Sequence, residues 1–207
     1  RRDLMDNSMR IENISERIHL GLHYLDNNPD PNQGWMPRGG IITGSASYYA
    51  HGEWDACDGG WRMVEAYILA RKVLDQPYPG PAEQKLRTFV YATIREDGLS
   101  YRPDRPWCRP EAYMWDQGRA LIALATWLRM EPSEEVAGIA HRMADSLASI
   151  AIRKGDCWVY PAENWRGTGW GDVVYAHPPT GLAIEGLVDL AHLLHDLLRD
   201  GSGRCGA

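Results

Sequence analysis

Three apolar segments that repeat along the chain constrain its fold more than any other feature of the sequence. They read DGGWRMVEAYILARKVL from Asp58, DQGRALIALATWLRM from Asp116 and TGLAIEGLVDLAHLL from Thr180. The spacing is roughly sixty residues, about the length of one helical hairpin. Each segment opens near a glycine and continues with small apolar residues, and helices of this kind are usually buried on several sides. We therefore expect these segments to form an inner layer of helices.

Apolar residues spaced three and four positions apart predict six helices in all. The predicted helices cover 8–25, 60–74, 81–94, 110–130, 133–152 and 180–198. Pro81 and Pro110 suit a first helical turn, and Asp97-Gly98 suits a stop. The first, third and fifth helices are amphipathic, so outer and inner helices alternate. The sequence predicts an all-α fold with almost no strand, built from three consecutive helical hairpins in a single domain over residues 1–207.

The connections of the predicted hairpins differ in length. Inner helices lead to outer ones through short turns, whereas the long segments 27–59, 95–109 and 154–179 lead from outer to inner helices. In a stack of antiparallel hairpins, all three long segments emerge at the same end. Loops longer than about 12–15 residues are usually functional or disordered, and these are too aromatic to be disordered. We expect them to form one functional face.

Aromatic residues support a binding role for this face. The chain has nine Trp and ten Tyr but one Phe, and six of the nine Trp lie in the three long segments. Trp and Tyr have a polar edge and suit surfaces that are partly apolar and partly wet, as a sugar ring with its hydroxyl rim requires. The alternative is that they only pack the loops onto the helix ends. The candidate substrate-binding residues are Trp54, Asp55, Tyr101, Trp107, Arg109, Trp115, Trp165 and Trp170.

Two aspartates are the candidate catalytic carboxylates. Asp58 and Asp116 hold matching positions in two repeats and are expected to face each other across the mouth of a cleft. Glycosidic cleavage needs one carboxylic acid and a second carboxylate as base or nucleophile. For Asp58 the alternative is a helix N-cap. Asp116 lies inside a predicted buried helix, where Asp is unfavourable without a partner or a function.

Other titratable residues are weaker candidates. His51 and His177 precede the first and third inner helices and are candidate acid–base groups, although loop histidines often have no such role. Glu65 and Glu185 recur at corresponding places on inner helices, where pairing with an arginine is favoured over catalysis.

Composition excludes several classes of function. A net charge of −6 argues against nucleic-acid binding, and no apolar run long enough for a membrane span is present. The amino end has no signal-peptide pattern, which slightly favours the cytoplasm. Four Cys lie far apart without a CxxC pair, so free thiols are favoured over a disulfide or metal ligands. We expect no metal and no cofactor, and a carbohydrate or oligosaccharide as the partner.

The sequence resembles the (α/α)6-toroid glycosidases, the six-hairpin superfamily. The likeness rests on helix starts of the form D-x-G at Asp58 and Asp116, on DGLSYRP at 97–103 and on EAYMWDQGRALIAL at 111–124. It implies a central cleft for oligosaccharides, and unsaturated glucuronyl hydrolases of this fold use Asp near the starts of inner helices, as at Asp58 and Asp116. The β-L-arabinofuranosidases of similar fold use a zinc-binding Cys cluster, which the dispersed Cys do not match. Six hairpins make a ring and this chain supplies three, so we expect a partial toroid from a longer catalytic domain.

Three functions compete on this reading. A glycoside hydrolase would use the two aspartates, and a sugar epimerase or polysaccharide lyase of the same fold would use His51, His177 or Tyr101. A non-catalytic helical module would bind a glycan or a protein through its aromatic face. Two acids about 5–10 Å apart across a cleft would favour hydrolysis, whereas acids buried in arginine pairs would favour the module.

Overall fold

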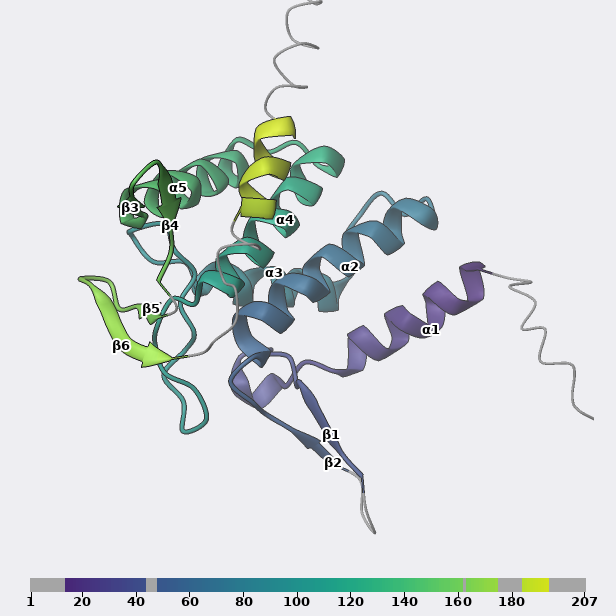
Figure 1. Ribbon diagram of the computed structural model, residues 1–207. Coiled ribbons are helices and arrows are strands. Elements are labelled where there is room, and N and C mark those ends of the chain that lie inside the picture. The colour runs from purple at the N-terminus through teal and green to yellow at the C-terminus, as the bar shows by residue number, and fades with distance from the viewer. Residues whose placement is uncertain (1–13, 44–47, 162, 175–183, 194–207) are drawn as a thin grey trace, which may run out of the picture.

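The computed structural model describes residues 14–43, 48–161, 163–174 and 184–193, and this part of the chain is largely helical (Figure 1), as predicted. The helices are α1 (Ile14–Asn27), α2 (Gly60–Val73), α3 (Pro81–Ala92), α4 (Met114–Met130) and α5 (Glu134–Ile150), and residues 184–193 are also helical.

The start of α4 differs from the prediction. The sequence predicts a helix from residue 110, but α4 begins at Met114. Tyr113 is extended, and Ala112 forms an antiparallel bridge with Trp165 of the third long segment. The residues before Met114 therefore give their backbone hydrogen bonds to another segment instead of to a helical turn.

Three short antiparallel hairpins, which the sequence did not predict, lie in or beside the long segments. They pair β1 (Gly40–Ile42) with β2 (Tyr48–Ala50), β3 (Ile152–Lys154) with β4 (Cys157–Val159), and β5 (Glu163–Trp165) with β6 (Trp170–Val174). Gly155, with φ of 61°, and Asp156 form the two-residue turn between β3 and β4. A turn of this length needs a residue that tolerates positive φ. The hairpins explain how long aromatic segments satisfy their backbone groups without helix.

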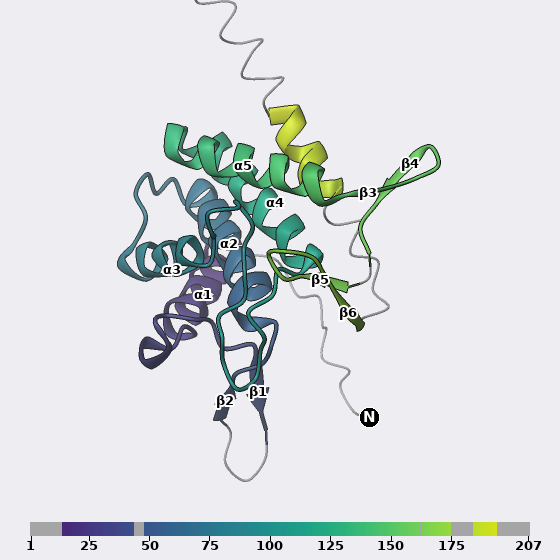
Figure 2. The ribbon, with the colours of Figure 1, turned by 90° about the vertical axis from the view of Figure 1, so that its left-hand side faces the viewer.

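Helix α4 occupies the centre of the domain. It packs against α2 on one side and α5 on another, while α1 and α3 pack on α2 (Figures 1 and 2). Residues 184–193 also lie against α4, where a Cβ on Gly186 would come within 2.8 Å of the Gly118 carbonyl oxygen and 2.7 Å of the Leu121 Cβ. Glycine at this position permits the close approach of the two backbones.

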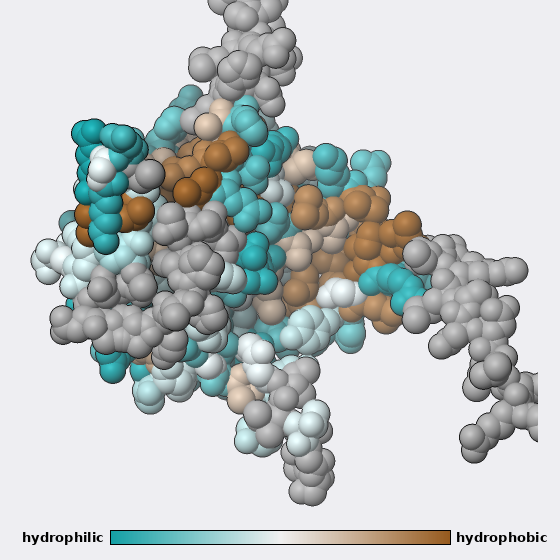
Figure 3. Space-filling model, in the orientation of Figure 1, coloured by the Kyte–Doolittle hydropathy of each residue, from teal (hydrophilic) through white to brown (hydrophobic). Residues whose placement is uncertain are grey.

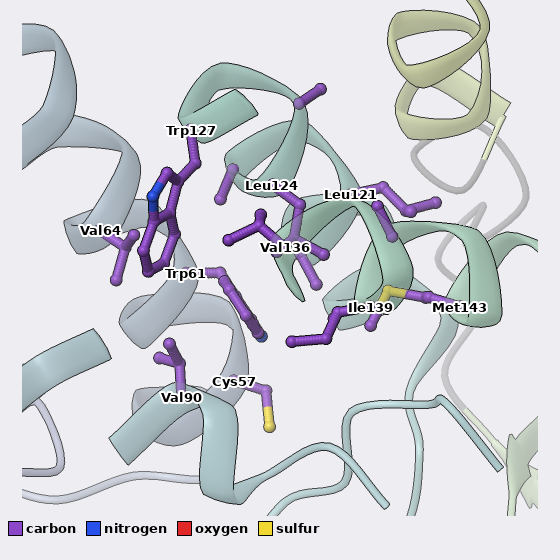
Figure 4. Packing of buried hydrophobic residues seen from close by; sticks show 14 of the residues in the cluster. Cys57, Trp61, Val64, Val90, Leu121, Leu124, Trp127, Val136, Ile139 and Met143 are labelled. Atoms are coloured by element: carbon purple, nitrogen blue, oxygen red, sulfur yellow. The ribbon is translucent and has the colours of Figure 1, made fainter. Parts of the chain in front are cut away.

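The hydrophobic core lies between α2, α3, α4 and α5. Trp61 and Val64 of α2 belong to it, together with Leu121, Leu124 and Trp127 of α4 (Figure 4). Helix α5 contributes one apolar face at helical spacing: Val136, Ile139, Ala140, Met143 and Leu147. Its start is fixed by Ser133, whose hydroxyl accepts from the Val136 N–H. Burying each large apolar side chain stabilises the fold by about 1.5–3 kcal/mol.

One edge of the helical array remains apolar and exposed. Helix α1 has no fully buried residue, and Leu69 and Val73 of α2 are 46% and 61% exposed. The surface over α1 and α2 is correspondingly hydrophobic (Figure 3). No described helix is long and apolar enough to cross a membrane.

Candidate functional site

The three long segments contact one another beside the starts of α2 and α4, as the hairpin stacking predicted. The second long segment extends to Tyr113, because α4 begins only at Met114. The first and second meet where the His51 ring stacks on Trp107, with centroids 5.1 Å apart, and where Trp54 meets Tyr113 edge to face at 6.2 Å. The second and third meet where Ala112 and Trp165 exchange backbone hydrogen bonds of 2.8 and 3.0 Å. This region brings together side chains from positions far apart in the sequence.

We call the region formed by Glu53, Trp54, Asp58, Tyr113 and Trp115 the mouth. Trp54 and Asp58 flank or lie in the single π-helical turn Asp55–Gly59 (η2) that leads into α2. Tyr113 precedes the first residue of α4, and Trp115 lies in its first turn. The starts of α2 and α4 therefore position most of the mouth residues.

Asp116 lies in the first turn of α4 and is completely buried. The buried Arg102 donates to its carboxylate from Nε at 2.7 Å and from Nη2 at 3.0 Å. Both carboxylate oxygens are thus occupied, in the paired geometry that gives strong ion pairs. A general acid or nucleophile has to reach its substrate, so the predicted catalytic role of Asp116 has no support in this geometry. The carboxylate instead anchors the second long segment to α4.

The pKa values of this pair are shifted by burial and by the partner. Burial raises the pKa of Asp116, because the interior solvates a carboxylate poorly, and the charge and hydrogen bonds of Arg102 oppose that effect. Burial alone would lower the pKa of Arg102, but the Asp116 carboxylate raises it above its ordinary value. The guanidinium therefore stays charged.

Asp58 is closer to solvent than Asp116, with 14% of its side chain exposed. Its Oδ1 accepts from the Arg62 Nε at 2.9 Å and from the Trp115 Nε1 at 2.8 Å, and the Arg119 Nε lies 3.8 Å away. The start of α2 has no side-chain cap, so Asp58 is not the N-cap that the alternative reading suggested. It positions Trp115 and two arginines at the mouth.

Trp54 is the most exposed aromatic residue of the mouth, at 36%. The guanidinium carbon of Arg102 lies 4.5 Å from the Trp54 ring centroid and 3.4 Å from that of Tyr113. The Arg102 Nη1 is buried and has no hydrogen-bond partner among the described residues; Glu53 Oε2 is 3.9 Å from it. The cation thus contacts two aromatic rings, and its Nη1, which carries two N–H groups, has Glu53 as its nearest carboxylate in the described part of the chain.

His51, Asp55 and Trp107 form a separate cluster that fixes the first long segment. The His51 Nδ1 is 3.1 Å from Asp55 Oδ2, and its Nε2 is 3.2 Å from Asp30 Oδ2. Asp55 is buried and also accepts from the Gly52 N–H at 2.6 Å. Both ring nitrogens of His51 are occupied and its face is covered by Trp107, so the predicted acid–base role of His51 and the predicted ligand contact of Asp55 have no support in this geometry.

The remaining predicted residues are distributed around the mouth. Tyr101 is buried, donates its hydroxyl hydrogen to Asp97 and lines a groove beside α3. Trp165 and Trp170 pack edge to face at 5.4 Å on the β5–β6 hairpin, joined to the second segment through Ala112. Arg109 is exposed. His177 lies outside the described residues.

Glu65 lies below the mouth on α2, half-buried, with its Oε1 3.4 Å from the Thr126 hydroxyl of α4. Burial raises its pKa, and Asp189 and Glu185 raise it further, whereas Thr126 and Arg119 lower it. An arginine was the expected partner of Glu65, and Arg119 acts on the pKa of Glu65 through its charge at a distance. Glu65 faces the side of the array where residues 184–193 approach α4.

Sequence reasoning did not select Arg102, Tyr113 or Glu53 as site residues. All three lie in the stretches DGLSYRP and EAYMWDQG or directly before Trp54. Asp116 was the available signal, because an aspartate within a buried helix requires a cationic partner such as an arginine. Which of the nearby arginines supplies it depends on the path of residues 95–113.

Among the described residues, no group of three or more His, Cys, Asp or Glu side chains is arranged to hold a metal ion. Cys57 is fully buried, and burial together with nearby Asp116 raises the pKa of its thiol to about 12. Cys57 and Cys108 are free. Comparison of the chain with protein-family models, curated proteins and solved structures found no match.

Proposed function

We propose that the mouth binds a carbohydrate and that the chain is a glycoside-hydrolase-type domain acting on an oligosaccharide. The observation that carries this proposal is the exposure of Trp54, which is 36% exposed before α2 and meets Tyr113 edge to face. The Asp58–Trp115 hydrogen bond joins the starts of the same two helices. An exposed aromatic face beside paired polar groups can stack on the apolar face of a sugar while hydrogen-bonding its hydroxyls.

The charges around the mouth favour a ligand of low net charge. The carboxylates of Glu53, Asp58 and Asp116 are matched by three arginines, Arg62, Arg102 and Arg119. A matched set of donors and acceptors suits hydroxyl groups, which both donate and accept, better than it suits a multiply charged ligand. An uncharged oligosaccharide has this chemistry.

Hydrolysis is the activity we propose for this site, with Asp58 and Glu53 as the carboxylates. Their side chains are 14% and 28% exposed, whereas Asp116 is inaccessible. One would protonate the leaving oxygen and the other would act as base or nucleophile. The second candidate is a non-catalytic glycan-binding module, which the burial of Asp116 in an arginine pair favours.

The helix arrangement supports a partial α/α toroid. α4 carries more buried side chains than any other described helix. α1 and α3 pack on α2, and α5 packs on α4. Residues 184–193 approach α4 through Gly186, although Ile184 and Val188 are 48% and 46% exposed. An arc of three hairpins would leave an apolar edge where the next pair of helices packs in a complete ring. The exposed apolar surface of α1 and α2 fits that expectation.

Binding is tested by calorimetry of the chain against a panel of neutral oligosaccharides. Trp54→Ala should weaken binding of a recognised glycan by about 2 kcal/mol, near thirtyfold, as for a central aromatic contact. Trp158→Ala is the matched control, because Trp158 is 61% exposed on β4 and outside the mouth. Equal affinities of the two variants, or no binding of any glycan, would reject the carbohydrate site.

Hydrolysis is tested on the same glycans with Asp58→Asn and Glu53→Gln, with folding checked by thermal melting. Loss of a catalytic acid or base should lower turnover by about 10²-fold or more. Full turnover in both variants would rule out these carboxylates. Binding without any turnover in the unmodified chain would leave the module as the function.

A further inference from the structure

A groove of about 660 Å³ lies beside α3, outside the mouth. Its walls come from α3, from the turn at 33–35 and from residues 101–105 of the second long segment. None of the five mouth residues lines it. The volume is in the range of small-molecule sites.

The groove is cationic although the chain has a net charge of −6. Lys85, Arg95, Arg102 and Arg105 line it, and the only acidic lining residue in the described part of the chain is Asp104. Arg102 is already neutralised by Asp116. The other three cations give the groove a local excess of positive charge.

None of these three cations has a carboxylate partner in the described part of the chain. Among the described residues, Lys85, Arg95 and Arg105 form no ion pair within 4.0 Å. The Lys85 Nζ lies 3.8 Å from the Trp35 ring centroid, and the Arg95 guanidinium lies 3.9 Å from that of Tyr101. An aromatic face holds a cation in place and leaves its N–H donors available to an anion. Two of the cations are thereby oriented without being neutralised.

The rim that carries Trp35 is held in an unfavourable backbone conformation. Trp35 has φ of 71°, which side-chain-bearing residues rarely adopt, and its N–H donates to the Asp30 carbonyl at 2.8 Å. Asp30 in turn accepts from the Asn32 N–H at 2.9 Å. Residues held in this way cost about 1–3 kcal/mol and are concentrated at ligand sites. The turn places the indole over Lys85 at the edge of the groove.

We propose that this groove binds a ligand bearing two or more oxyanion groups, with Lys85, Arg95 and Arg105 as its charge partners and Trp35 and Tyr101 as its flat walls. Phosphate and sulfate groups share this chemistry, so a polyphosphate and a sulfated sugar are both candidates. The site is distinct from the proposed neutral-glycan site and does not depend on it.

The test measures binding of two probes to the 207-residue chain by calorimetry: inorganic pyrophosphate and a sulfated disaccharide. Lys85→Ala and Arg95→Ala should each weaken binding about tenfold or more, as loss of a hydrogen bond to a charged group does. Lys154→Ala, an exposed cation on β3, is the control and should leave affinity unchanged. Affinity should also fall as salt is raised.

Each outcome decides the proposal. Binding of pyrophosphate alone identifies a phosphate ligand, and binding of the disaccharide alone identifies a sulfated sugar; both support the groove. No binding of either probe at millimolar concentration overturns it. Equal loss in Lys154→Ala and Lys85→Ala also overturns it, because the attraction would then be diffuse. Circular dichroism of the variants, whose altered side chains are exposed, confirms that they remain folded.

Discussion

Removing the charge of Asp116 tests the central electrostatic feature of the structure. The carboxylate is completely buried and accepts two hydrogen bonds from the buried Arg102. Each hydrogen bond to a charged group contributes about 1.5–3 kcal/mol. Asp116→Asn removes the charge with almost no change in volume, so the guanidinium stays buried without a counter-charge. Loss of one partner of a buried pair costs about 3–5 kcal/mol.

That cost is large beside the whole stability of a domain, about 5–15 kcal/mol. For a domain of this size it corresponds to a fall in Tm of about 6–20 °C. Urea unfolding followed by circular dichroism gives the free-energy difference directly. Asp189→Asn is the control, because Asp189 is 37% exposed and its partner Arg129 is 3.9 Å away; it should cost less than about 1 kcal/mol.

A loss below about 1 kcal/mol in Asp116→Asn, with an unchanged denaturant slope, would refute this reasoning. It would mean that Arg102 finds another partner, such as Glu53, or that water reaches the pair. Replacing both partners by apolar residues gives a second measurement. The double variant should be more stable than Asp116→Asn, because no charge is then left buried alone.

Three further outcomes are expected. Burial alone would raise the pKa of Glu131, but Arg87 and Arg71 lower that pKa below its ordinary value of 4.5. The stability that ionised Glu131 contributes is therefore present above pH 4.5 and is lost as the pH falls through the folded-state pKa. In Glu131→Gln, urea unfolding should show a smaller loss of stability at acid pH. Cys57, whose pKa is raised to about 12, should resist iodoacetamide at about pH 8 in the folded chain and react after unfolding, as read by peptide mapping; labelling of the folded chain would contradict its burial. Gly186→Ala should cost about 1–3 kcal/mol in thermal or urea unfolding, because the added Cβ meets α4, and a neutral effect would show that residues 184–193 do not pack there.

Much of the helical structure follows from the sequence. α2 and α3 begin at the predicted residues, and α5 begins within one residue of its prediction because Ser133 caps it. These signals are local: spacing of apolar residues, a cap and a proline act over one or two turns. The hairpins in the long segments were not predicted, because such short strands owe their pairing to the partner strand rather than to their own pattern.

The position of the candidate site could be predicted from the sequence, but the roles of its residues could not. Alternation of long and short connections is enough to bring the long segments to one end, and the contacts of Trp54, Trp107 and Trp165 lie there. The repeat predicts the same role for Asp58 and Asp116, because they occupy the same position in two repeats. In the structure one is partly exposed and the other is completely buried.

What the sequence determined by itself is therefore the largely helical content, the starts of α2, α3 and α5, and the contact between the aromatic segments. The tertiary structure decided which carboxylate reaches solvent, which arginine it pairs with, and that His51 is fixed between two aspartates. The physical reason is that a side chain's accessibility and charge partner depend on how residues 95–113 fold back over the helix starts. Burial, rather than position in a repeat, determines whether an aspartate acts as a reagent or as an anchor.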